Sequence, residues 1–516
     1  MGSLAKTYSQ EKLLGQIYTP TFIIEKILDD MDYHTQAEIL GKPLLDPACG
    51  NGRFLIEAAK RVIAISPKKD LVKNLEQLYG WDIDELAVDE CIENMDHLVK
   101  PLDIKVDWQI KCLDSLQYIE HPYEPGGEKS GKHTTRFDFI VGNPPYIRVQ
   151  HLDETQRKYI QTHYSFCKSG STDIYMAFFE LCHKLLTPTG VCGLITPNTY
   201  FYTQTAKVMR DAFAHLKNIR QITNYGKIQV FQNATTYSAI TIFTKKIYSP
   251  QHQFFLFQQA IDKDAFQERE VAIEEIQDKA IWQLSATRKL NNEGVKLGDI
   301  CEIHTGLATL MDKAYVFEVE PLDDTFVWAN TKLKGRVKME KAVLKPIIKA
   351  STFKKGDAIT ECILFPYRVD TTEEKGQTVN KHVIIPEREL AGSYPEAFAY
   401  LLTIKSELDK RDNGKPNPVA WYAFGRSQGL DTSFGEKIIF SPMNKKPNFI
   451  HISDPNSTYY SGYCIKYSGD YQKLLAQLNS QAMEEFIEIS ARDFRGGWKA
   501  YSKKILQQFV VDAASL

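Results

Sequence analysis

The sequence predicts an open α/β fold whose mostly parallel sheet carries a ligand site at the carboxyl ends of its strands. The clearest strand is the apolar run 137–142, which has the length and composition of a buried parallel strand. A second apolar run, 43–46, leads into a glycine-containing turn and then a helical pattern. Strand and helix patterns alternate up to about Lys245, as in sheets whose parallel strands are joined by helices. Ligands of such sheets bind outside the carboxyl ends of the strands, so we expect the site there.

The residues directly after the run 137–142 suit a planar ligand group that carries an NH2. They are Asn143, Pro144, Pro145 and Tyr146. The prolines fix φ and remove two backbone donors, so the carbonyls are open to accept hydrogen bonds from a ligand. The Asn143 side chain adds an acceptor, and the Tyr146 ring can stack on the ligand. An ordinary turn is the alternative for these residues alone, because Asn-Pro pairs commonly form turns.

Length and composition predict a two-domain globular protein. The chain has 516 residues, of which 43% are hydrophobic and 25% charged. We place a first domain at 1–250, a connecting segment at 251–290 and a second domain at 291–516. The βα alternation stops near 250, and the sequence that follows is charged and mixed in composition. The formal charge of −2 means that any nucleic-acid surface is a local basic face.

Cysteine usage and hydropathy favour a reducing cytoplasm without membrane association. The nine cysteines occur singly, and no Cys or His spacing is typical of a zinc site, so we predict no metal. No apolar run approaches the ~20 residues that span a bilayer, and no secretory signal opens the chain.

The turn after the run 43–46 is predicted to approach a ligand closely. It contains Gly50 and Gly52, and the helix behind it offers free N–H groups. The turn is neither GxGxxG nor a phosphate-binding P-loop, which disfavours a nucleoside triphosphate. Earlier in the chain, Thr19 is predicted to cap a helix that has Pro20 at its first position.

Three acidic residues follow successive predicted strands. Asp46 ends the first strand, Asp82 follows 78–81, and Asp114 follows 106–110. An acid at the tip of the first strand favours a cationic ligand. An acid at the second tip can accept from both ribose hydroxyls, and Asp114 is placed to accept from an exocyclic amino group. One such acid is usually a solvated strand end, but three in successive units favour a site.

The remaining segments are less regular. The polar stretch from Ile147 to Ser171 is predicted to be a loop, and Phe231 lies between strands expected at 219–225 and 238–244. In the C-terminal half, basic and aromatic residues interleave, for example around Trp421 and Trp498. This composition suits phosphate contact combined with stacking.

Together these motifs resemble those of amino-directed DNA methyltransferases. Asp46 to Phe54 matches DPACGxGxF, Asn143 to Tyr146 matches NPPY, and the preceding Thr19-Pro20 matches the order of the gamma class, exemplified by the TaqI-type adenine-N6 enzymes. The resemblance covers roughly residues 15–245. It implies a Rossmann-like S-adenosylmethionine-dependent catalytic domain followed by a mixed α+β DNA target-recognition domain.

The resemblance also implies a cofactor, a substrate and roles for particular residues. The cofactor is S-adenosylmethionine, and the substrate is an adenine flipped out of double-stranded DNA, stacked between Tyr146 and Phe231. Asn143 and the Pro144 carbonyl accept hydrogen bonds from the amino group, which turns the nitrogen lone pair toward the methyl group. The implied cofactor-binding residues are Thr19, Pro20, Asp46, Ala48, Cys49, Gly50, Gly52, Asp82, Ile83, Asp114, Ser115 and Asn143.

Other functions stay open at this point. Release-factor glutamine methyltransferases and enzymes acting on RNA bases share NPPY, and a non-catalytic DNA-binding modification subunit is a further alternative. Few residues precede Gln16, so we expect any cognate restriction endonuclease to be a separate protein. We expect the chain to act as a monomer on DNA.

Overall fold

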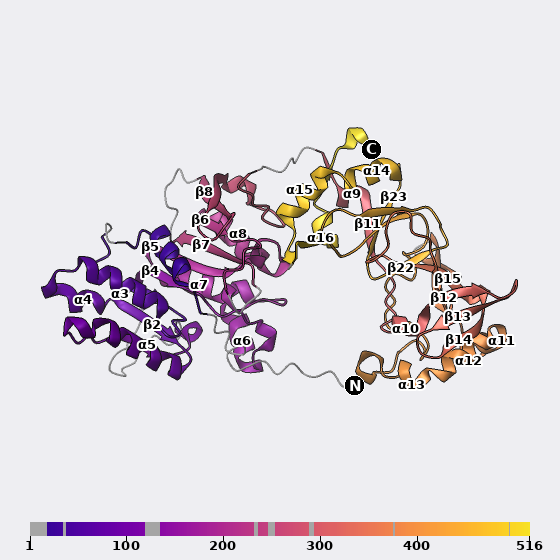
Figure 1. The fold of residues 1–516 in the computed structure, drawn as a ribbon, viewed down its shortest axis with the longest axis horizontal. Helices are drawn as coiled ribbons and strands as arrows, with labels where there is room; N and C mark the ends of the chain where they lie inside the picture. The colour runs from indigo at the N-terminus through magenta and orange to yellow at the C-terminus, as the bar shows by residue number, and fades with distance from the viewer. Residues whose placement is uncertain are drawn as a thin grey trace. The chain divides into compact units, whose positions relative to one another are not determined.

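The chain forms two compact units, Met1–Lys289 and Leu290–Leu516, in a computed structural model (Figure 1). The structure describes residues 18–34, 38–118, 135–231, 236–245, 253–287, 294–374, 377–494 and 496–516.

A nine-stranded sheet forms the centre of the first unit, in the order β3-β2-β1-β4-β5-β7-β6-β8-β9. The strands β1 to β6 and β8 run parallel to one another, whereas β7 and β9 are antiparallel to their neighbours. The strands are β1 Leu44–Asp46, β2 Leu78–Asp82, β3 Gln109–Cys112, β4 Phe137–Gly142, β5 Leu186–Pro197, β6 Ile219–Asn224, β7 Ser238–Thr244, β8 Phe254–Ala260 and β9 Phe266–Ala272.

The strand order reverses between β1 and β4, and this reversal positions the site. Leu45 of β1 pairs with Tyr79 of β2 on one side and Ile140 of β4 on the other. Chain connections leave such a point in opposite directions, which opens a crevice at the carboxyl ends of the strands. The residues after β1, β2, β3 and β4 therefore meet at one edge of the sheet.

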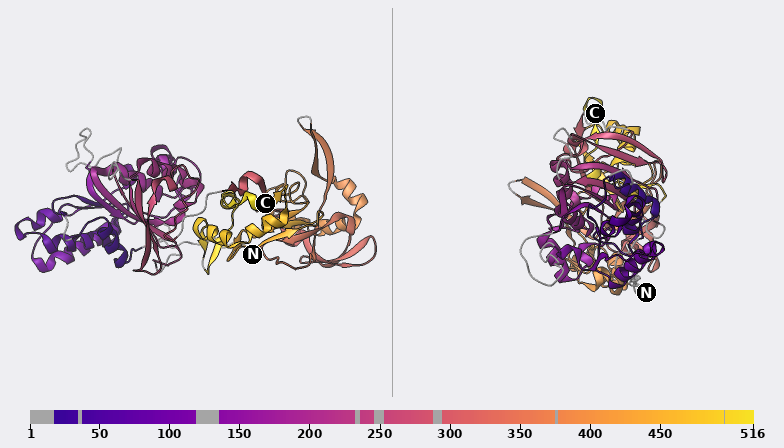
Figure 2. Two further views of the ribbon diagram at one scale, coloured as in Figure 1. Left: turned by 90° about the horizontal axis from the view of Figure 1, so that it is seen from above. Right: turned by 90° about the vertical axis from the view of Figure 1, so that its left-hand side faces the viewer.

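Helices cover both faces of this sheet (Figures 1 and 2). Val141 and Phe139 of β4 pack with α2, α3 and α5, whereas Ile140 packs with α7 and α8. Because both faces are buried at the centre of the sheet, β4 and β7 are almost continuously apolar. The helices of the unit are α2 Thr21–Asp30, α3 Arg53–Ile65, α4 Leu71–Leu75, α5 Glu85–Val99, α6 Glu154–His163, α7 Tyr175–Leu185 and α8 Lys207–Leu216.

The structure confirms the strands predicted at 137–142 and 238–244 to the residue, and it corrects three other predictions. The segment 251–290 does more than connect, because β8 and β9 extend the sheet from β6. The polar stretch 147–171, predicted as a loop, contains α6. Thr19 does not cap α2: Pro20 occupies the cap position, without a side-chain cap hydrogen bond, and the helix begins at Thr21.

The second unit combines several smaller sheets with short helices. A four-stranded sheet has the order β11-β23-β19-β21, and a six-stranded sheet has the order β14-β13-β12-β16-β15-β22. A long antiparallel hairpin, β17–β18, extends from the body of this unit (Figure 2). Two further small sheets are β10-β26 and β20-β25-β24.

The elements of this unit have the following bounds. The strands are β10 Val295–Lys296, β11 Cys301–Thr305, β12 Val316–Pro321, β13 Phe326–Thr331, β14 Gly335–Glu340, β15 Leu344–Lys349, β16 Glu361–Leu364, β17 Tyr367–Glu374, β18 Gln377–Ile384, β19 Lys437–Phe440, β20 Met443–Asn444, β21 Phe449–Ile452, β22 Thr458–Tyr460, β23 Tyr463–Tyr467, β24 Asp493–Phe494, β25 Trp498–Ala500 and β26 Val510–Val511. The helices are α9 Leu297–Ile300, α10 Asp312–Tyr315, α11 Glu387–Ser393, α12 Pro395–Thr403, α13 Lys405–Leu408, α14 Tyr471–Leu478, α15 Gln481–Ser490 and α16 Lys503–Leu506.

Candidate active site

The glycine turn between β1 and α3 has a backbone that requires glycine. Gly52, at the N-terminus of α3, has φ +85°, and a Cβ there would lie 2.5 Å from the Cys91 sulfur. Gly50 has φ +50°. The Gly50 N–H donates to Asp82 Oδ2 at 2.8 Å, so the turn is tied to the end of the neighbouring strand β2. The turn is thus held rigidly, with little side-chain bulk, at the switch point of the sheet.

Two carboxylates beside this turn are held in surroundings that disfavour their charge. Asp46 is 1% exposed, and burial raises its pKa to about 8, although the Ala48 N–H donates to it at 3.1 Å. Burial also raises the pKa of Asp82, which accepts from the backbone N–H groups of Gly50 and Asp84. A cation placed between these groups would favour their charged forms.

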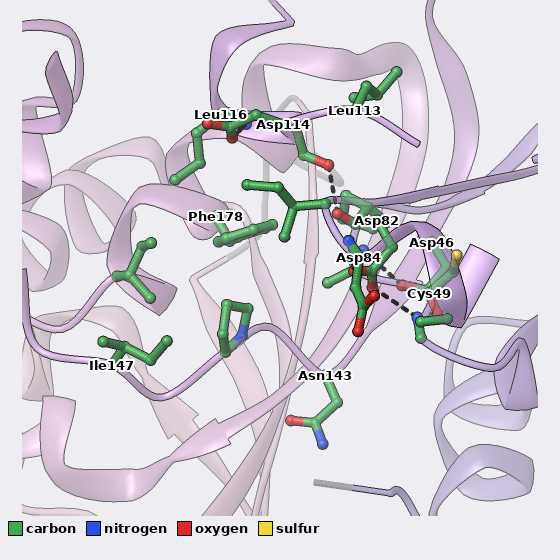
Figure 3. Close-up of a pocket in the computed structure, with 18 of the residues that line it drawn as sticks. Asp46, Cys49, Asp82, Asp84, Leu113, Asp114, Leu116, Asn143, Ile147 and Phe178 are labelled. Atoms are coloured by element: carbon green, nitrogen blue, oxygen red, sulfur yellow. Dashed lines mark hydrogen bonds between the residues drawn. The ribbon is translucent and has the colours of Figure 1, made fainter. Parts of the chain in front are cut away.

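A pocket of about 490 Å³ opens at the carboxyl ends of β1 to β4 (Figure 3). In this view Asp46, Asp82 and Asp84 lie together, and Ile147 and Phe178 lie across the pocket from them. Among the described residues that line it, Arg53 is the one Lys or Arg. The volume is in the range of small-molecule sites, and the excess of acidic groups suits a ligand with positive charge.

The third strand-end acid, Asp114, lies at the upper rim of this pocket in Figure 3. Its carboxylate accepts from the Leu116 N–H at 3.0 Å and from Gln117 Nε2 at 2.8 Å. The adjacent Ser115 hydroxyl donates to the Pro47 carbonyl at 2.6 Å. This bond ties the loop after β3 to the turn after β1, so the two sides of the pocket are fixed to each other.

Asn143 follows β4 and lines the same pocket. Its Nδ2 donates to the Thr19 hydroxyl at 3.1 Å. Tyr146 donates to the Ile195 carbonyl at 3.2 Å, and its half-buried ring meets the rings of Tyr175 and Phe231 edge-on. A side-chain amide, whose carbonyl is a hydrogen-bond acceptor, therefore lies beside the same pocket as the three acids.

The structure brings most of the predicted site residues together. Those that line the pocket are Thr19, Asp46, Ala48, Cys49, Gly50, Asp82, Ile83, Asp114, Ser115, Asn143 and Pro145. The described lining does not include Pro20, Gly52, Pro144, Tyr146 or Phe231. Gly52 shapes the turn instead. Phe231 is 2% exposed and packs in the core with Val230 and Ile240, so the prediction that its face stacks on a base does not fit this structure.

The sequence reasoning missed one wall of the pocket. Gln156, Tyr159 and Ile160 of α6 line it, together with Ile174 and Phe178 near α7. A usable signal was Asp153, whose side chain accepts from the Gln156 N–H at 3.0 Å and caps α6. The acidic residues Asp84 and Glu90 and the basic Arg53 were also missed, because none of them ends a strand.

The described residues contain neither a metal-binding cluster nor a helix that could span a membrane. Among these residues, no group of three or more His, Cys, Asp or Glu side chains is arranged to hold a metal ion. Within the same part of the chain, the helices are too short or too polar to cross a membrane.

Comparison with known proteins points to restriction-modification methylases. Residues 56–231 match the family described as Eco57I restriction-modification methylase. The chain is 24% identical to the type II restriction enzyme and methyltransferase RM.Eco57I of Escherichia coli, and the alignment covers 95% of this chain and 56% of that protein. It is 22% identical to the type II methyltransferase M.BstVI of Geobacillus stearothermophilus, over 97% of this chain and 90% of that protein. The chain is thus homologous to type II methyltransferases and spans little more than half of RM.Eco57I.

A solved structure supports the fold. The type IIL restriction-modification enzyme MmeI, determined in complex with DNA, superposes with a TM-score of 0.57 at 11% identity. The superposition covers 94% of this chain and 66% of that one. At this identity, the likeness concerns the arrangement of the chain alone.

Proposed function

We propose that the protein transfers a methyl group from S-adenosylmethionine to the exocyclic N6 of an adenine flipped out of duplex DNA. One observation carries the proposal: Asn143 lines the same pocket as Asp46, Asp82 and Asp114. A side-chain acceptor for an amino group therefore lies beside a site suited to a cationic nucleoside. The similarity to type II methyltransferases supports the proposal, as does the order of the motifs.

The residues present fit S-adenosylmethionine. Asp46 would face the cationic end of the cofactor, Asp82 the ribose hydroxyls and Asp114 the adenine amino group. Ile83 is 59% exposed and lines the pocket, so its side chain is available to pack on the adenine ring. When bound, the cofactor supplies a methyl group on a sulfonium, which is an electrophile.

The chain's own contribution is positioning and electrostatics. The lone pair of an adenine amino nitrogen is delocalised into the ring, so the nitrogen is a poor nucleophile. The Asn143 side-chain oxygen and the Pro144 carbonyl would accept hydrogen bonds from its two N–H groups and favour a pyramidal nitrogen. Preorganised acceptors of this kind act without covalent catalysis. Tyr146 would stack on the flipped base, and this stacking would offset part of the free-energy cost of extruding the base from the duplex.

The direct test is to incubate the purified protein with labelled S-adenosylmethionine and duplex DNA and to sequence the methylated bases. We expect N6-methyladenine within one short recognition sequence. If the label enters a protein glutamine or RNA but not DNA, the protein is instead a glutamine or RNA-base methyltransferase that shares the NPPY motif. Methylcytosine would retain the DNA substrate and refute the adenine assignment. Cofactor binding without any transfer would favour a non-catalytic subunit.

Replacing Asp82 with alanine should weaken cofactor binding. The carboxylate would lose its contact with the ribose, and the turn would lose the acceptor of the Gly50 N–H. A hydrogen bond to a charged group contributes roughly 1.5–3 kcal/mol, so we expect roughly tenfold to hundredfold lower affinity by calorimetry. Asp82→Asn is the matched control, since it keeps the shape and one acceptor and should lose less. Unchanged affinity in both variants would place the ribose elsewhere.

Cofactor binding should release a proton near neutral pH. With a pKa of about 8, the Asp46 carboxyl is mostly protonated at pH 7 in the free protein. A bound cation favours the carboxylate and lowers this pKa, so binding expels the proton and affinity rises with pH until about pH 8, above which the free carboxyl is already charged. Calorimetry in buffers of different ionisation enthalpy measures the proton count. Asp46→Asn should abolish the release, whereas proton uptake by the wild type would contradict the assignment.

Removal of the second unit should abolish sequence specificity. Because β8 and β9 complete the sheet, the fragment should end at Lys289 rather than before β8. We expect Met1–Lys289 to bind the cofactor but to bind specific and unrelated duplexes with nearly equal, strongly salt-dependent affinity. Fluorescence anisotropy with both duplexes at two salt concentrations measures this. Methylation of one unique site by the fragment would show that recognition lies in the first unit.

A further inference from the structure

Thr19 is fixed in a position that bears directly on Asn143. It immediately precedes Pro20 at the start of α2, and it is 4% exposed. Its carbonyl accepts from Arg53 of α3 at 3.3 Å, and its hydroxyl accepts from Asn143 Nδ2 at 3.1 Å. The Arg53 guanidinium also lies 5.2 Å from the centre of the Tyr18 ring. Arg53 therefore holds the backbone around Thr19 through the Thr19 carbonyl and the ring of the preceding Tyr18.

We infer that Thr19 is a positioning residue that sets the orientation of the Asn143 amide. This inference rests on the proposed function and deepens it. A side-chain amide has a donor end and an acceptor end. The target amine of the proposed reaction presents N–H groups, so only the Oδ1 end of Asn143 accepts from it. With Nδ2 donating to Thr19, Oδ1 is the end of the amide that can accept a hydrogen bond from the amine. In a turned amide, the donor Nδ2 would face the N–H donors of the amine.

The pocket position of Thr19 strengthens this arrangement. A hydroxyl can donate as well as accept, so Thr19 could also satisfy a turned amide by donating to its oxygen. Thr19 lines the pocket, however, and its hydroxyl would donate a hydrogen bond to an acceptor on a ligand bound beside it. Once that proton is engaged, Oγ1 can only accept from Asn143. Occupation of the cofactor site and correct orientation of the catalytic amide are then linked through one hydroxyl.

The test compares Thr19→Val with Thr19→Ser in the full chain. Valine keeps the shape of threonine and removes the acceptor, so at saturating cofactor and DNA we expect kcat to fall about tenfold with little change in KM for DNA. Serine keeps the hydroxyl and should stay within about twofold of wild type. Thr241→Val is the matched control, because Thr241 is a buried threonine bonded to the Tyr200 hydroxyl at 2.6 Å and lies outside the pocket lining. It should lower the melting temperature without lowering kcat.

A second readout needs neither cofactor nor activity. A double-mutant cycle compares the melting temperatures of the wild type, Thr19→Val, Asn143→Ala and the double variant. If the two side chains are bonded, the melting temperature of the double variant should fall by less than the sum of the decreases in the two single variants. Additive losses, or a Thr19→Val variant with wild-type kcat and only weaker cofactor affinity, would overturn the inference and leave Thr19 as a cofactor contact. A wild-type protein that methylates no DNA would instead refute the proposed function, and the thermal cycle would still test the bond.

Discussion

Replacing Asn143 with alanine should abolish methyl transfer to DNA while leaving cofactor affinity near its wild-type value. In the proposed reaction Asn143 contacts the amine, and its role is to accept a hydrogen bond from an N–H group as the nitrogen becomes pyramidal. Loss of one preorganised transition-state contact costs about 3 kcal/mol or more, which is at least a hundredfold in kcat. Single-turnover methylation with saturating cofactor measures the chemical step, and calorimetry measures the affinity.

The control for this variant is a buried asparagine remote from the pocket. Asn74 of α4 donates to the Ser66 hydroxyl at 2.7 Å. Asn74→Ala removes the same atoms from the same unit, and we expect lower stability with unchanged turnover. If Asn143→Ala turns over near the wild-type rate, the NPPY segment is a structural turn. If it loses cofactor binding and turnover equally, Asn143 belongs to the cofactor site.

The parts of the site that could be predicted are those marked by a pattern within a few consecutive residues. Continuous apolar runs identified β4 and β7 because both faces of the sheet are buried, and the acids at strand ends stand out against them. Asp46, Asp82 and Asp114 do line one pocket, because β1, β2 and β3 are adjacent and parallel. That adjacency is a property of strand order, which the sequence shows only through the resemblance to a known fold.

The parts that were missed depend on contacts between residues distant in the chain. The bond from Asn143 to Thr19 joins positions 124 residues apart, and no local pattern predicts it. Strand β9 carries many polar side chains, because it lies at the edge of the sheet and most of its residues are exposed or half-buried. Helix α6 is polar on most of its surface, and only Ile160 is buried. Its apolar signal was therefore weak, and its capping residue was the one clear sign.

Phe231 illustrates a residue whose role changes once its burial is known. Stacking on a base requires an open ring face, but Phe231 is only 2% exposed. Its ring packs edge-on with the Tyr146 ring, and the two ring centroids are 6.5 Å apart. Tyr146 in turn bonds to the Ile195 carbonyl and contacts Tyr175 edge-on. Phe231 thus packs against Tyr146, which follows the proposed catalytic Asn143, and the free energy of unfolding should depend strongly on Phe231.

Replacing Phe231 with alanine should destabilise the first unit by about 3–5 kcal/mol, the usual cost of removing a buried aromatic ring. Leucine and tryptophan then separate the two roles. A core position tolerates leucine at a cost of about 1.5 kcal/mol or less, whereas the larger tryptophan overpacks it and costs about 1–3 kcal/mol. A stacking position behaves in the opposite way: tryptophan keeps the flat face, and leucine loses it. Calorimetric unfolding and methylation assays below the transition should show a stable, active leucine variant and a weakened tryptophan variant. An active tryptophan variant beside an inactive but stable leucine variant would restore Phe231 to the base pocket and require a rearrangement that opens its face.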